Sequence, residues 1–155
     1  MNNLQSLSYF YPELLLTVVI LAAIIYDLFL KSEDSGKVGL LLVFGLILVF
    51  ISLYMQDDGL TTTLFTDAIV LDPFSNFFKI IIVLSTILVS IFSLYNDELK
   101  DYRKGEYFTL LGIITFGLFL MVSSIDLVMV YLSIEIVSIM SFVLAGYLKQ
   151  NTRSN

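Results

Sequence analysis

The sequence contains no cysteine and no histidine, and only 14% of its 155 residues are charged. Without cysteine the chain has neither disulfides nor thiolate metal sites, and without histidine it lacks the commonest transition-metal ligand and neutral-pH base. These absences exclude redox and zinc chemistry within the chain, and we expect no cofactor on it. The charges are mostly acidic, with a net charge of −6, which argues against nucleic acid as a ligand.

Hydrophobic residues make up 58% of the chain, and the mean hydropathy is +0.94. Ordinary soluble domains carry about 25% charged residues, so this composition predicts an integral membrane protein. Apolar runs of about 20 residues match a hydrocarbon core about 30 Å thick. We therefore predict an all-α fold with five transmembrane helices in a single membrane domain spanning residues 1–155, with helices at 14–30, 38–54, 74–95, 107–122 and 125–148.

Lysine and arginine outside the predicted helices fall in alternate connecting segments. The segments at residues 1–11 and 55–72 and the Ser123-Ser124 turn contain none. By the positive-inside rule, we expect the N terminus outside and the C terminus in the cytoplasm of a multi-pass protein of the inner (plasma) membrane. The basic segments contain Lys31 and Lys37, then Lys100, Arg103 and Lys104, and finally Lys149 and Arg153.

The segment at residues 55–72 is acidic, rich in threonine and too short for a domain. Asp58-Gly59 followed by residues 60–65 predicts a small β-hairpin. At its end Asp72-Pro73 is typical of a helix start, because the aspartate accepts hydrogen bonds from the first turn and proline tolerates the first helical position.

Glu135 is the only carboxylate in the middle of the otherwise apolar stretch from Ile125 to Leu148. A charge at the bilayer centre costs about 2.5–3.5 kcal/mol on insertion scales, so such residues usually face a partner or a water path. About ten residues separate Glu135 from the nearer end of the predicted helix, too far for its short side chain to reach an interface. Glu135 is therefore the main candidate for a functional residue; the alternative is a buried acid that only locks helix packing.

Helical spacing places Tyr131 and Ser138 on the face of Glu135, with Ser141 close to the same stripe. The two serines have three possible uses: to donate hydrogen bonds, to hold water, or to let another helix approach closely. Desolvation favours the neutral form of an acid and a nearby cation favours its charged form, so an acid between these influences can relay protons. The five predicted helices offer no obvious lysine partner at the midplane.

Other charged residues near helix ends have simpler interpretations. Lys79 lies about two turns inside the third predicted helix, where its stem can reach the outer interface; a buried ionic role is the alternative. Glu106 and Asp126 stand at the starts of the fourth and fifth predicted helices, where the positive end of the helix dipole stabilises a carboxylate. Asp27 is close enough to the inner end of the first helix to reach headgroups or Lys31.

Several motifs together resemble the antiporter-like membrane subunits of respiratory complex I. They are EYFTLLG at 106–112, Gly117, SSIDLVMVYLSIE at 123–135, Ser138 and Tyr147. Pro12-Glu13-Leu14 and LDPFSNFFK at 71–79 are similar to the pattern of subunit N of NADH-quinone oxidoreductases. The resemblance covers nearly the whole chain.

The resemblance implies a proton-translocating membrane subunit of an enzyme that couples electron transfer from NADH to quinone with ion pumping. Glu135 matches the family's essential glutamate, which pairs there with a lysine two helices further on. Flavin, iron–sulfur clusters and NADH belong to other subunits in that family. The implied partners of this chain are other membrane subunits of the complex and the lipid bilayer.

Family members have about fourteen helices, including two repeats of inverted topology. This sequence stops soon after the fifth predicted helix, so we interpret it as an N-terminal fragment without the partner lysine. Two other functions stay open: a subunit of a related cation/proton antiporter or membrane-bound hydrogenase, and a purely structural membrane scaffold.

Overall fold

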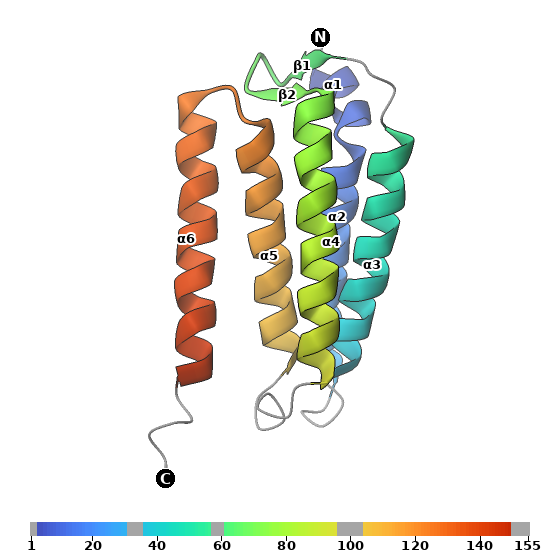
Figure 1. Ribbon diagram of the computed structural model, residues 1–155, viewed down its shortest axis with the longest axis vertical. Helices are drawn as coiled ribbons and strands as arrows, with labels where there is room; N and C mark the ends of the chain where they lie inside the picture. Colours follow the sequence, from blue (N-terminus) through green and yellow to red (C-terminus); the bar gives the residue numbers. More distant parts are fainter. Residues whose placement is uncertain (1–2, 31–35, 57–60, 96–103, 150–155) are drawn as a thin grey trace.

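The structure, a computed structural model, describes residues 3–30, 36–56, 61–95 and 104–149 (Figure 1). These ranges contain α1 (Asn3–Tyr9), α2 (Tyr11–Phe29), α3 (Gly36–Met55), β1 (Thr62–Leu64), β2 (Ile69–Leu71), α4 (Pro73–Tyr95), α5 (Lys104–Ser123) and α6 (Leu127–Lys149). Helices α2 to α6 are each long and apolar enough to cross a membrane. The prediction of five such helices is confirmed, whereas the short helix α1 was not predicted.

Helix boundaries agree with the predicted ones to within three residues. Helix α4 begins at Pro73 after a cap by Asp72, whose Oδ1 accepts a hydrogen bond of 2.8 Å from the backbone N–H of Ser75. Helix α6 begins two residues later than predicted, because Asp126 is its cap: Oδ1 of Asp126 accepts from the N–H of Val128 at 3.2 Å. Both caps satisfy N–H groups that have no partner within the helix.

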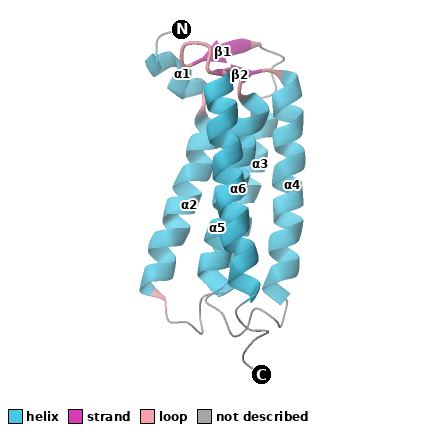
Figure 2. Cartoon of the chain, turned by 90° about the vertical axis from the view of Figure 1, so that its left-hand side faces the viewer, coloured by secondary structure: helices cyan, strands magenta, loops and turns pink. Residues whose placement is uncertain are grey.

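Helices α2, α3, α4 and α5 pack into a bundle, and α6 lies outside it, chiefly against α5 (Figures 1 and 2). Between 28% and 44% of the most apolar window is buried in each helix of the bundle, against 6% in α6. Helix α3 contributes the most complete apolar stripe to the core: Leu42, Leu46, Val49 and Leu53, all 0% exposed.

Helix α4 has a polar inner face. Its buried residues recur every three or four positions, which is the spacing of one helical face, and all except Val83 are polar. Two of them bond across to α5: Thr86 to the hydroxyl of Thr115 at 3.1 Å, and Ser93 to the hydroxyl of Tyr107 at 2.8 Å. Polar groups turn inward because the hydrocarbon offers them no hydrogen-bond partner. The stripe consists of Ser75, Asn76, Lys79, Val83, Thr86, Ser90 and Ser93.

Two glycines allow close contacts between helices. A Cβ atom on Gly45 of α3 would lie 2.3 Å from Cγ1 of Val19 on α2. On Gly117 of α5 it would lie 2.9 Å from Cγ2 of Val137 on α6. Small residues that let helix backbones approach are typical of membrane interfaces, because association depends there on close packing.

The β-hairpin lies across one end of the helices, beside α1 (Figure 1). Thr62 pairs with Leu71 and Leu64 with Ile69 in the antiparallel register. The predicted hairpin exists: strand β1 lies within the predicted residues 60–65, and the turn follows it at residues 65–68. Asp58 and Gly59 themselves lie outside the described residues. Phe65, Thr66 and Asp67 all have positive φ, a conformation that costs a non-glycine residue about 1–2 kcal/mol.

Contacts with α1 and with the connection between α5 and α6 hold this turn in place. The N–H of Phe65 donates to the Ser6 hydroxyl of α1 at 3.3 Å. The carbonyl of Ala68 accepts from the N–H of Ile125 at 3.1 Å, in the connection between α5 and α6. The hairpin therefore ties the first helix to the last two.

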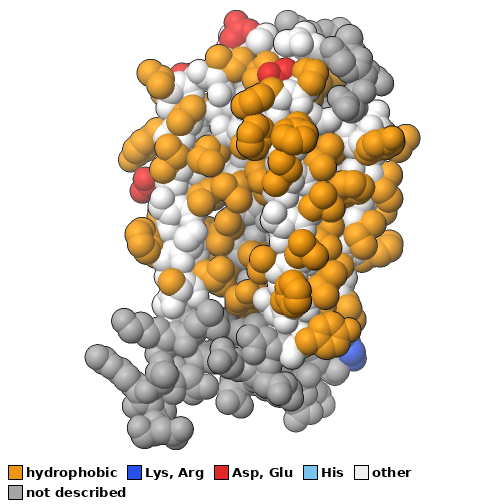
Figure 3. Space-filling model, viewed as in Figure 1, with side chains coloured by type: hydrophobic (Ala, Val, Ile, Leu, Met, Phe, Trp, Pro, Cys, Tyr) orange, Lys and Arg blue, Asp and Glu red, His pale blue; other side chains and the backbone are white. Residues whose placement is uncertain are grey.

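Hydrophobic side chains cover most of the helical surface in the view of Figure 3. The exposed hydrophobic residues of the chain include Leu21, Phe44, Phe92, Val128 and Phe142, which are all at least half exposed. An apolar surface of this extent is stable against lipid and not against water, in keeping with a multi-pass membrane protein.

We expect Gly45→Ala to destabilise the bundle by about 1–3 kcal/mol, the usual effect of overpacking, since the new Cβ would overlap Val19. Gly146→Ala on α6 is the matched control, because nothing lies within 4 Å of its Cβ position. Thermal unfolding in detergent, followed by circular dichroism, measures both variants. Equal melting temperatures would contradict the close α2–α3 contact.

Candidate functional site

Glu135 lies in the middle part of α6, eight residues after Leu127 and fourteen before Lys149. At about 1.5 Å per residue, it is about 12 Å from the start of the helix and about 21 Å from its end. Its side chain is exposed, and among the described residues it has no hydrogen-bond or ion-pair partner. The acid thus lies deep in an apolar helix, on a surface that the described chain leaves uncovered.

The predicted neighbours of Glu135 share this open surface to different degrees. Tyr131 is 66% exposed, Ser141 is exposed and Ser138 is half-buried. Ser133 is instead the fully buried serine of α6, and its hydroxyl donates to the carbonyl of Met129 in its own helix at 2.6 Å. The face around Glu135 is therefore free to meet a further element.

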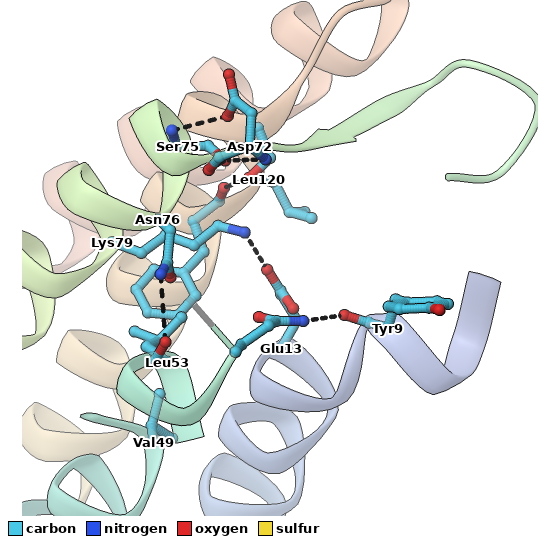
Figure 4. Close-up of polar contacts among 12 residues, drawn as sticks. Tyr9, Glu13, Val49, Leu53, Asp72, Ser75, Asn76, Lys79 and Leu120 are labelled. Atoms are coloured by element: carbon cyan, nitrogen blue, oxygen red, sulfur yellow. Dashed lines mark hydrogen bonds and ion pairs between the residues drawn. The ribbon is translucent and has the colours of Figure 1, made fainter. Parts of the chain in front are cut away.

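Lys79 is buried and forms an ion pair with Glu13. Its Nζ lies 2.5 Å from Oε1 of Glu13, and each residue is 2% exposed (Figure 4). The expectation that the lysine reaches the outer interface is therefore wrong, and the alternative of a buried ionic role is confirmed. Lys79 turns inward because α2 and α4 begin at the same end of the bundle, which brings Glu13 to nearly the same depth.

Polar and aromatic groups surround this ion pair. Asn76, one turn before Lys79, donates from Nδ2 to the carbonyl of Leu53 on α3 at 3.2 Å (Figure 4). The Oδ1 atom of Asn76 is buried and has no hydrogen-bond partner in the described part of the chain. The ring of Phe119 on α5 lies 6.0 Å from the lysine Nζ, at the outer range of a cation–π contact.

The sequence held a signal for this pair that our prediction did not use. Glu13 is in the first turn of α2, and Lys79 is the only basic residue within the described part of α4. Placing both helix starts at one side of the membrane puts opposite charges at similar depths. Only the helix packing, however, shows that the two side chains face each other.

Asp27 and Glu106 lie at the other end of the bundle. Asp27 is 9% exposed, which does not fit the expected headgroup contact, and it packs against Gly105, where a Cβ atom would collide with its carboxylate. Lys31, its other expected partner, lies outside the described residues. Glu106 is exposed in the first turn of α5, as the dipole argument predicts.

An open cavity of about 340 Å³ lies between α2, α5 and α6 at this end, lined by Ile24, Asp27, Glu106, Thr109, Leu110 and Val143. We did not predict from the sequence that Asp27 and Glu106 share a cavity. Nowhere in the described ranges do three acidic, histidine or cysteine side chains form a group that could hold a metal ion.

Comparisons with known proteins show what the chain is similar to. The chain is 36% identical over 151 residues to NADH-quinone oxidoreductase subunit N 2 of Chloroherpeton thalassium, and 34% identical over 152 residues to subunit N of Chlorobium chlorochromatii. The matches cover 96% and 97% of this chain and 30% of each relative. The chain is a homologue of NADH-quinone oxidoreductase subunit N. The resemblance inferred from the motifs is thus confirmed.

This subunit N homologue is also 32% identical over 159 residues to F(420)H(2) dehydrogenase subunit N of Methanosarcina mazei, a match over 97% of this chain and 32% of that protein. No protein-family model matches the chain. The chain spans about 30% of the length of the curated relatives it matches. The uncovered face of α6 is consistent with a structure that continues beyond the residues described.

We expect Lys79→Met to lower the free energy of unfolding of the subunit N homologue by about 3–5 kcal/mol, because it leaves the buried Glu13 carboxylate without its cation. The double variant Glu13→Gln/Lys79→Met should recover most of this loss, because it removes both buried charges. Unfolding in detergent by heat or denaturant compares the three proteins. A double variant as unstable as Lys79→Met would show that the ion pair is not the cause.

Proposed function

We propose that the chain is part of a membrane subunit of an NADH-quinone oxidoreductase of the complex I type and takes part in proton translocation, with Glu135 as the proton-carrying group. The observation that supports this most is the position of Glu135: it lies about 12 Å inside an apolar helix, on a face that nothing in the described chain covers. In lipid, an ionised carboxylate there would be unfavourable by several kcal/mol.

The rest of the subunit, or a neighbouring subunit, is the expected cover for this face. A cation placed there would favour the charged form of Glu135, and its withdrawal would favour proton uptake. The family resemblance implies a lysine in this role. Tyr131, Ser138 and Ser141 lie on or beside the same face and are proposed to hold the hydrogen bonds or water through which the proton moves.

The electron-transfer chemistry is proposed to belong to other subunits, which would carry flavin, iron–sulfur clusters and the NADH site, with quinone as the substrate of the complex. Relatives named after two electron donors, NADH and F(420)H(2), match this chain at similar identity. We therefore place the choice of donor outside this chain. A subunit of a complex that uses the second donor is the alternative that the matches favour.

Orientation in the membrane is also proposed from charge. Among the described helices, Lys37 is the second residue of α3, Lys104 begins α5 and Lys149 ends α6, all at the end of the bundle away from the hairpin. At the hairpin end stand Asp67, Asp72 and Asp126. The positive-inside rule then places the hairpin outside and the lysine-bearing end in the cytoplasm.

Proton translocation in membrane vesicles tests Glu135 in the full-length subunit within its complex. We expect Glu135→Gln to lower the proton translocation rate at least tenfold. A positioned proton-transfer group contributes a factor of about 10²–10⁴ to a rate, so tenfold is the smallest loss that fits the proposal. Glu135→Asp should retain part of the activity. Asp67→Asn is the matched control, because Asp67 is an exposed carboxylate in the hairpin turn and asparagine tolerates its positive φ.

Normal translocation by an assembled Glu135→Gln complex would rule out Glu135 as a proton carrier. That result would favour the alternative interpretation, in which Glu135 only locks helix packing. Loss of translocation in the Asp67→Asn control would show instead that the assay reports general damage.

The absence of cysteine from the 155 residues offers a direct test of orientation. Thr63→Cys on β1 and Lys37→Cys on α3 place single exposed thiols at opposite ends of the bundle. An impermeant maleimide should label Thr63→Cys in intact cells and Lys37→Cys only after permeabilisation. The reverse pattern would invert the proposed topology.

A further inference from the structure

The buried ion pair of Glu13 and Lys79 lies apart from Glu135, inside the bundle of α2 to α5. Both residues are 2% exposed and their charged atoms lie 2.5 Å apart. Neutral side chains of similar volume commonly stabilise a protein as well as a buried ion pair does, so stability gives no reason for charges here. Ionisable residues within membrane segments are by default candidates for function.

No third charge in the described chain neutralises either member of the pair. The charged side chains of α3 and α5, namely Lys37, Lys104 and Glu106, lie at the opposite end of the bundle, as does Asp27 of α2. At the same end, Asp72 caps α4 through Ser75, Asp67 is exposed in the hairpin turn, and Asp126 caps α6. Helix α1 has no charged residue; the nearby phenols are Tyr9, which is exposed, and Tyr11, which donates to the carbonyl of Ser52 at 2.9 Å.

Asn76 carries an acceptor on the same inner face of α4 as Lys79. It lies three residues before Lys79 on the inner face of α4 and is 4% exposed, and its Oδ1 atom has no partner among the described residues. Buried acceptors are nearly always satisfied, and lipid cannot satisfy this one. The ammonium of Lys79, one turn further along this face, is the only charged donor of the described part of α4 and so the donor we assign to this oxygen when it is released from Glu13.

The carboxylate of this pair is also close to the end of the bundle. Glu13 is two residues after Tyr11, the first residue of α2, or about 3 Å along the helix axis. Helix α1 and the hairpin cover this end (Figure 1). The path of a proton to Glu13 is therefore short from the aqueous phase on the hairpin side and long from the aqueous phase at the other end of the bundle.

We propose that Glu13, Lys79 and Asn76 form a second proton-binding site, separate from Glu135. The Glu13 carboxylate takes up one proton from the hairpin side and becomes a neutral carboxyl group. The Lys79 ammonium keeps its own proton and moves its hydrogen bond from Glu13 to Oδ1 of Asn76. The net charge of the site changes from zero to +1, and release of the proton reverses both steps.

Infrared difference spectra of the complex holding the full-length subunit, taken during a pH titration without turnover, test this site. In the wild type, acidification should give the carbonyl band of a buried, protonated carboxyl group. The band should be missing from Glu13→Gln and from Glu13→Gln/Lys79→Met, the double variant that we expect to fold. It should persist in Asp67→Asn and in Glu135→Gln, so the outcome is independent of the role proposed for Glu135.

The variant Asn76→Leu separates proton binding from mere packing. Loss of the second acceptor makes the protonated state less favourable, so the band should appear at a pH lower by about one unit, which corresponds to a tenfold weaker proton affinity. An unchanged midpoint would overturn the acceptor role of Asn76. If Glu13→Gln/Lys79→Met kept the carbonyl band of the wild type, the proposal of a proton-binding site at Glu13 would be overturned.

Discussion

Water is absent from the hydrocarbon interior of a membrane, so every polar group there must find its partner within the protein. The inner face of α4 meets that requirement for most of its polar groups, although Asn76 Oδ1 and Ser90 Oγ have no partner among the described residues. Thr86 bonds to Thr115, Ser93 to Tyr107 and Lys79 to Glu13, so one helix connects to α2 and α5 through polar contacts at three levels. The exposed residues of α4 are consequently mostly apolar ones such as Phe77, Leu88 and Phe92, which lipid accepts.

The same requirement explains why Glu13 and Glu135 differ in their surroundings. Glu13 has its cation inside the bundle and is buried with it. Glu135 belongs to α6, which packs chiefly against α5 and turns its other faces away from the bundle. Among the described residues Glu135 has no cation, so the described chain holds one complete ion pair and one exposed acid within an apolar helix.

Helices were predictable from the sequence because each apolar run is long and ends at a polar or capping residue such as Asp72 or Asp126. Two features were not. The hairpin turn depends on positive φ at Phe65, Thr66 and Asp67, without a glycine to indicate it. The contact of Lys79 with Glu13 joins residues 66 positions apart, and only the packing of α2 against its neighbours determines it. Glu135 stood out because a lone acid in an apolar run needs no tertiary information to be noticed.

The close contact at Gly117 has a consequence for the direction of Glu135. A Cβ atom on this glycine would collide with Val137 and would lie 3.0 Å from Cγ2 of Ile136, the two residues that follow Glu135. Successive residues of a helix are about 100° apart around its axis, so seating Ile136 and Val137 against α5 also fixes the angle at which Glu135 leaves α6. The absence of a side chain at Gly117 on α5 thus fixes the direction in which the Glu135 carboxylate leaves the neighbouring helix α6.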